Sequence, residues 1–178
     1  MGHDPCRQCM TSLSYRLEDV RDVYPNFVLS LLSKLLIDGD NAPLYQSLIE
    51  SGYALDWIAP VCGMEQGART TSFHVGVQGV RLEDLDQFSD RVKDILADVV
   101  RNGIPEARID AVLHQYELAV RHESAQFGLN LILGLSHAVN HEVNLEEALR
   151  IQALIDRFNK DRESSPNLLI DMIQKYLL

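Results

Sequence analysis

The sequence lacks the features that mark a secreted or membrane protein. Three cysteines among 178 residues are too few, and odd in number, for a disulfide framework. No apolar run approaches the roughly 18 residues that a membrane-spanning helix needs. The first residues form neither a signal peptide nor an Arg-rich transit peptide. We therefore expect a soluble chain in a reducing compartment, with no visible targeting segment and no membrane partner.

Basic charge is also scarce. The 16 Lys and Arg residues face 26 Asp and Glu residues, which gives a net charge of −10. This balance argues against binding to nucleic acid, because phosphate contacts need a basic face. Hydrophobic residues make up 46% of the chain, which is enough for a core that needs no disulfide bond or bound metal for stability.

Catalytic signatures are missing as well. The sequence contains no His-x-x-Glu-His or His-Glu-x-x-His zinc motif, no Gly-x-Gly-x-x-Gly or P-loop for phosphate, and no Gly-x-Ser-x-Gly elbow. We therefore predict no catalytic residue, no cofactor-binding residue and no metal ligand in this chain.

Two groups of residues are candidate metal ligands. His137 and His141 have the four-residue spacing of zinc ligands on a helix, but no carboxylate stands between them. His3, Cys6 and Cys9 offer three ligands near the N-terminus, yet a single Cys-x-x-Cys is a weak zinc signal. We interpret the first pair as a helix end and the second group as incidental, with a metal-binding regulator as a remote alternative.

A third group lies on one predicted helix. His114 and His122 are eight residues apart, with Glu117 and Glu123 nearby. Solvent-facing helix surfaces carry such residues routinely, so we interpret this group as a solvated face.

Periodicity of two predicts the strands. Residues 10–17 alternate apolar and polar side chains, as a half-buried strand does. Residues 54–62 and 70–80 are predicted to form two strands of a hairpin, joined by a loop over 63–69 that contains two glycines.

Apolar residues spaced three and four apart predict the helices. The segment Phe127 to Val139 is apolar nearly all round, so we expect it to be buried on most sides. Asn144 and Glu147 form a capping box. The predicted helices run from Pro25 to Gly39, Asn41 to Gly52, Leu82 to Gly103, Pro105 to Val120, Asn144 to Phe158 and Pro166 to Leu178.

These elements predict an α+β fold of two layers, in which an antiparallel or mixed sheet packs on helices and the C-terminal half is helical. We expect one domain over residues 1–178, with a possible hinge at 159–165 before the last helix. About three strands are too few to cover such broad apolar helix stripes. The sheet is therefore predicted to be incomplete, with further strands supplied from outside the chain.

Several segments then resemble one known family. Leu31 to Gly52 is similar to the "LLS-LL-DG-NSP-Y--LIESG" stretch of presequence proteases, a branch of the insulinase–pitrilysin metallopeptidases. Phe73 to Gly79 resembles that branch's "F-VGLQG" strand. Arg108 to Glu117, and Arg121 to Leu129, resemble its "RIEALLH-IE" and "KH-S--FGL" segments. The similarity runs through nearly the whole chain in order.

This resemblance implies that the chain is part of a larger, multidomain protease. Members of the family have four homologous α+β domains in two halves, which close around a chamber for unfolded peptides. The first domain holds the zinc, and a Glu of its motif is the general base. This chain is similar to the second domain, which has the same fold without ligands. The resemblance also implies that the chain stops before the final strand of that domain.

The function implied is therefore structural. We expect a non-catalytic domain of a zinc metalloendopeptidase that degrades targeting presequences, forming chamber wall beside the zinc domain in the mitochondrial matrix. Its partners would be the remaining domains of the protease or a homologous copy, and peptides only through the assembled chamber. The alternative is a standalone or truncated interaction module that self-associates or binds a protease.

Overall fold

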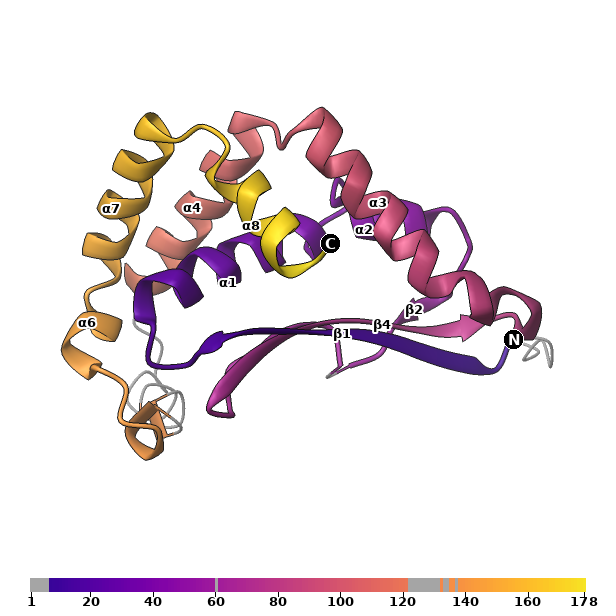
Figure 1. The fold of residues 1–178 in the computed structure, drawn as a ribbon, viewed down its shortest axis with the longest axis horizontal. Coiled ribbons are helices and arrows are strands. Elements are labelled where there is room, and N and C mark those ends of the chain that lie inside the picture. The colour runs from indigo at the N-terminus through magenta and orange to yellow at the C-terminus, as the bar shows by residue number, and fades with distance from the viewer. Residues whose placement is uncertain (1–6, 60, 122–131, 133–134, 137) are drawn as a thin grey trace.

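The computed structural model describes residues 7–59, 61–121, 132, 135–136 and 138–178. A sheet forms one layer and the helices form the other, as Figure 1 shows. In chain order the elements are β1 (Cys9–Asp19), α1 (Val23–Ile37), α2 (Pro43–Tyr45), a π-helical turn η1 (Gln46–Glu50), β2 (Asp56–Trp57), β3 (Gly63–Glu65), β4 (Thr70–Val80), a 3₁₀ segment η2 (Leu82–Gln87), α3 (Phe88–Asn102), α4 (Glu106–Arg121), α6 (Leu145–Leu149), α7 (Ile151–Ser164) and α8 (Leu168–Tyr176).

Strand β4 is the centre of the sheet. It pairs antiparallel with β1 along one side, and with the short strands β2 and β3 along the other. The predicted α+β class and the open, incomplete sheet are confirmed. The described strands number four, and all of their pairings are antiparallel.

The two faces of the sheet differ because side chains alternate along each strand. Toward the helices, Phe73, Val75 and Val77 of β4 are buried, and Leu13 and Tyr15 of β1 are half-buried. The opposite face carries mainly polar side chains, and no helix covers it in the view of Figure 1.

Helix α1 is buried on several sides, because the sheet lies beneath it and α4, α7 and α8 pack around it. Pro25 lies in its first turn, where a missing N–H costs no hydrogen bond. The helix ends at Ile37, shortly before Gly39, whose φ of +83° suits glycine. The four leucines Leu31, Leu32, Leu35 and Leu36 are each at most 2% exposed.

A buried polar junction joins β1, α1 and β4. Asn26, which is 4% exposed, donates through Nδ2 to the carbonyl oxygens of Asp19 at 2.7 Å and Asp22 at 2.9 Å. The hydroxyl of the fully buried Thr71 lies 2.8 Å from Asn26 Oδ1 and 3.0 Å from the carbonyl oxygen of Glu18. These bonds satisfy polar groups that would otherwise be costly to bury.

The predicted hairpin strand over 54–62 was wrong in extent. The chain pairs with β4 at β2, leaves the ladder, and pairs again at β3, inside the segment that was predicted to be loop. The carbonyl oxygen of Val61 lies 2.3 Å from where a Cβ on Gly76 would stand, so the intervening chain packs directly on the β4 backbone.

Two helix predictions also need correction. The predicted helix over 144–158 breaks at Arg150 (φ −86°, ψ 57°) into α6 and α7, although its N-cap bond from Glu147 N to Asn144 Oδ1 is present at 3.3 Å. Much of the segment Phe127 to Val139 lies outside the described residues. Ile132 and Val139 are described and are 68% and 59% exposed, so the expected burial fails at both.

The stretch 159–165 is mostly helical, because α7 continues to Ser164. Residues 165–167 then connect α7 to α8. A hinge at this place stays a prediction.

Candidate functional site

The residues weighed as metal ligands do not come together where the structure describes them. Cys9 begins β1 as a half-buried free thiol, and His141 Nε2 lies 3.3 Å from the carbonyl oxygen of Gly67. His114 is exposed on α4, with Nδ1 3.8 Å from Glu117 Oε2. The remaining candidates lie outside the described residues; they are His3, Cys6, His122, Glu123 and His137.

Within the described ranges, no group of three or more His, Cys, Asp and Glu side chains is placed to hold a metal ion. The donor set that zinc requires is therefore not found in this part of the chain. No helix among the described residues has both the length and the apolar character to cross a bilayer.

The first candidate surface is the outer face of the sheet, which we call the open sheet face. Its residues are Met10, Ser12, Ser14 and Arg16 of β1 and Ser72, His74, Gly76 and Gln78 of β4, which lie opposite one another in the antiparallel register. Val61, whose carbonyl oxygen lies against Gly76 on this face, adds an exposed apolar side chain.

A serine–histidine–serine chain crosses this face. His74 Nδ1 lies 2.8 Å from Ser14 Oγ, and His74 Nε2 lies 2.8 Å from Ser72 Oγ. A serine hydroxyl both donates and accepts, so either tautomer of the ring is satisfied. A nucleophilic triad would have a carboxylate on the second ring nitrogen, where this ring has another hydroxyl. The arrangement therefore fixes the ring in place between two hydroxyls.

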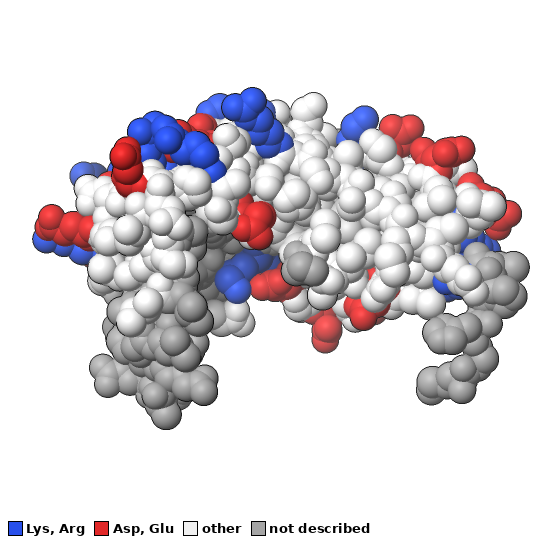
Figure 2. Space-filling model, turned by 90° about the horizontal axis from the view of Figure 1, so that it is seen from below, with Lys and Arg blue, Asp and Glu red and all other residues white. Residues whose placement is uncertain are grey.

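The open sheet face carries little charge. Figure 2, viewed from the sheet side, shows a largely uncharged expanse with Lys, Arg, Asp and Glu gathered mostly around its margins. Met10 is 64% exposed. The open sheet face therefore presents hydroxyls and isolated apolar side chains with little charge.

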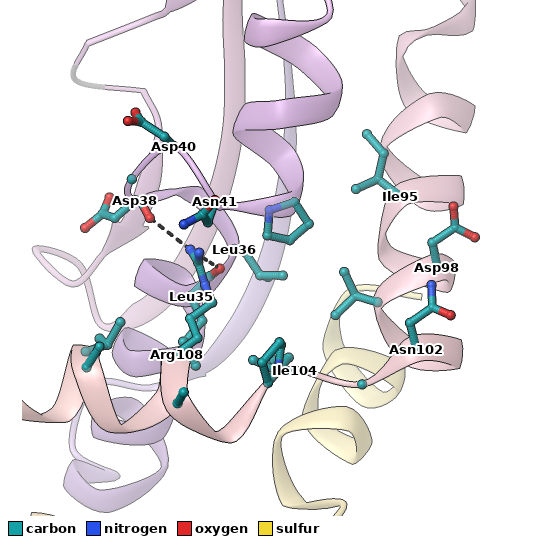
Figure 3. Close-up of a pocket in the computed structure, with 18 of the residues that line it drawn as sticks. Leu35, Leu36, Asp38, Asp40, Asn41, Ile95, Asp98, Asn102, Ile104 and Arg108 are labelled. Atoms are coloured by element: carbon teal, nitrogen blue, oxygen red, sulfur yellow. Dashed lines mark hydrogen bonds between the residues drawn. The ribbon is translucent and has the colours of Figure 1, made fainter.

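The second candidate surface is a groove of about 760 Å³ within the helical layer. It lies between the C-terminal end of α1, the following loop, the end of α3 and the start of α4 (Figure 3). Its walls are mainly apolar, with contributions from Leu35, Leu36, Ile95, Val99, Ile104 and Val112.

Arg108 occupies one side of the groove. Its Nη2 donates to the carbonyl oxygens of Leu35 at 3.0 Å and Asp38 at 2.9 Å, at the end of α1 (Figure 3). Burial lowers the pKa of its guanidinium, and the charge of Asp38 partly offsets this effect. Its main role is therefore to satisfy the last carbonyl groups of α1.

The carboxylates at the rim of the groove are largely balanced by nearby cations. Asp38 Oδ2 lies 3.3 Å from Lys34 Nζ, and Asp98 pairs with Arg101 on its own helix. The described residues that line this groove include no His or Cys.

Alternation along the strand over 70–80 groups His74 with Gly76 and Gln78 on one side, but it does not reveal the two serine partners. Ser72 could have been found, because residues two apart share a strand face. Ser14 could not, since its position beside His74 depends on the β1–β4 register.

The fold and the candidate surfaces define the class of the chain: an α+β domain with an open antiparallel sheet and, among its described residues, no metal-binding cluster. The family profile described as the peptidase M16 inactive domain matches residues 2–116. The chain therefore belongs to the peptidase M16 family, and the match is to the inactive domain of that family.

Curated relatives agree with this assignment. The chain is 37% identical over 175 residues to "Presequence protease, mitochondrial" of Yarrowia lipolytica, which covers 98% of the chain and 18% of the relative. The protein of the same name from Mus musculus is 35% identical over 176 residues, covering 99% and 17%. The chain thus spans less than a fifth of the length of these relatives.

Solved structures share the fold. An inactive peptidase domain of a zinc protease from Bordetella parapertussis superposes with a TM-score of 0.72 at 16% identity, covering 98% of this chain and 91% of that one. An M16-like peptidase from Alicyclobacillus acidocaldarius gives a TM-score of 0.63 at 16% identity, covering 99% and 40%. At this identity the likeness concerns the fold alone.

Proposed function

We propose that the chain serves as a non-catalytic domain of a zinc metalloendopeptidase that degrades targeting presequences and other unfolded peptides in mitochondria. The observation that carries this proposal is the match of almost the entire chain to presequence proteases, combined with the match to the inactive domain of the family. The zinc and the general base belong, in this proposal, to another part of the longer polypeptide.

In this proposal the domain forms part of the wall of a peptide-holding chamber, and the open sheet face is turned toward the peptide. Two features support this orientation. The open sheet face is largely uncharged and bears hydroxyls beside the exposed Met10 side chain, which suits varied unfolded sequences. The opposite face of the sheet is already buried against the helices and is not free for a ligand.

A domain replacement tests the scaffolding role. In the Yarrowia lipolytica relative, the segment that aligns with residues 1–178 is replaced by this chain, and a matched variant has the segment deleted. We expect the chimera to cleave a presequence peptide in a chelator-sensitive manner, and the deletion variant to lose this activity. Full activity after the deletion would contradict a scaffolding role.

The isolated chain provides the complementary test. With a fluorogenic presequence peptide, we expect no cleavage with or without added zinc, and no stoichiometric zinc by elemental analysis. Cleavage that a chelator abolishes would place catalytic chemistry in this chain and overturn the proposal.

A further inference from the structure

We draw no further inference here: the strongest candidate, the mainly apolar groove between the C-terminal end of α1, the end of α3 and the start of α4, carries no proposal, because nothing in the described part of the structure shows what covers it.

Discussion

Strands β4 and β1 have the same length and the same alternating pattern, yet they occupy different environments. Both contain eleven residues. On β4, Phe73, Val75 and Val77 are completely or nearly completely buried, because strands flank both sides and helices cover one face. On β1, Leu13 and Tyr15 are only half-buried. Alternation shows which residues share a face, whereas the number of neighbouring strands determines how deeply that face is buried.

The largest expected difference between the strands comes from truncating one core residue on each. Phe73→Ala should lower the free energy of unfolding by about 4 kcal/mol, because it leaves a cavity in the centre of the core. Leu13→Ala should cost about 1–2 kcal/mol, since its side chain is already partly exposed. Urea unfolding of both variants measures the difference. Equal losses of unfolding free energy would contradict the assignment of β4 as the central strand and β1 as the edge strand.

The junction between the strands should give the next largest effect. Asn26→Ala removes the amide that bridges the end of β1 and Thr71 of β4, so the carbonyl oxygens of Asp19 and Asp22 and the Thr71 hydroxyl each lose one buried hydrogen bond. We expect a loss of about 2–3 kcal/mol. Ser51→Ala, which loses two exposed bonds, one to the carbonyl oxygen of Ser47 and one from Tyr53 N, is the matched control and should change stability by less than about 0.5 kcal/mol.

Close backbone packing on β4 can be tested with glycine substitutions. Gly76→Ala would place a Cβ 2.3 Å from the Val61 carbonyl oxygen, and we expect it to cost about 2 kcal/mol by displacing the chain between β2 and β3. Gly67→Ala meets only the flexible Glu65 side chain and should be nearly neutral. Thermal melting of the two variants separates these cases, and a neutral Gly76→Ala would show that this backbone is free to move.

The smallest effect concerns charge at the end of β1. Arg21 and Arg69 hydrogen-bond to Asp19 and hold the pKa of its carboxyl well below its ordinary value. The stability from this lowered pKa is present above the ordinary Asp pKa of about 4 and is lost as the pH falls below it.

Asp19→Asn removes this contribution. The urea midpoint of the unaltered chain should therefore exceed that of the variant at about pH 7, and the gap should narrow below about pH 4. A gap that is independent of pH would show that the two ion pairs contribute nothing to folding.

Local patterns predicted much of this fold. The apolar spacing around Leu31 to Leu36 identified α1, and Asn144 with Glu147 located the start of α6, because both signals act within one or two turns. The division between β2 and β3 was missed, since it depends on how Val61 meets Gly76 across the sheet. The Ser14–His74 contact was missed for the same reason, as it requires the register between strands sixty residues apart.

For the candidate site, too, local features could be predicted from the sequence, whereas features that depend on contacts between distant segments could not. The absence of a zinc motif is visible in the sequence, and the resemblance identified the family that the comparisons then established. The two surfaces were not predictable from the sequence. The open sheet face needs strand pairing, and the groove needs the C-terminal end of α1 to meet the start of α4 through Arg108.

The most direct test of the proposed chamber wall uses two single variants of the chimeric protease. Each variant adds one positive charge, either to the sheet layer or to the helical layer of the domain. Ser12→Lys adds charge to the open sheet face, and Gln152→Lys adds it to the exposed surface of α7. We predict that Ser12→Lys raises the KM for a basic presequence peptide roughly two- to fivefold, while Gln152→Lys leaves it unchanged. Equal KM values for the two variants would contradict an open sheet face that is turned toward the peptide.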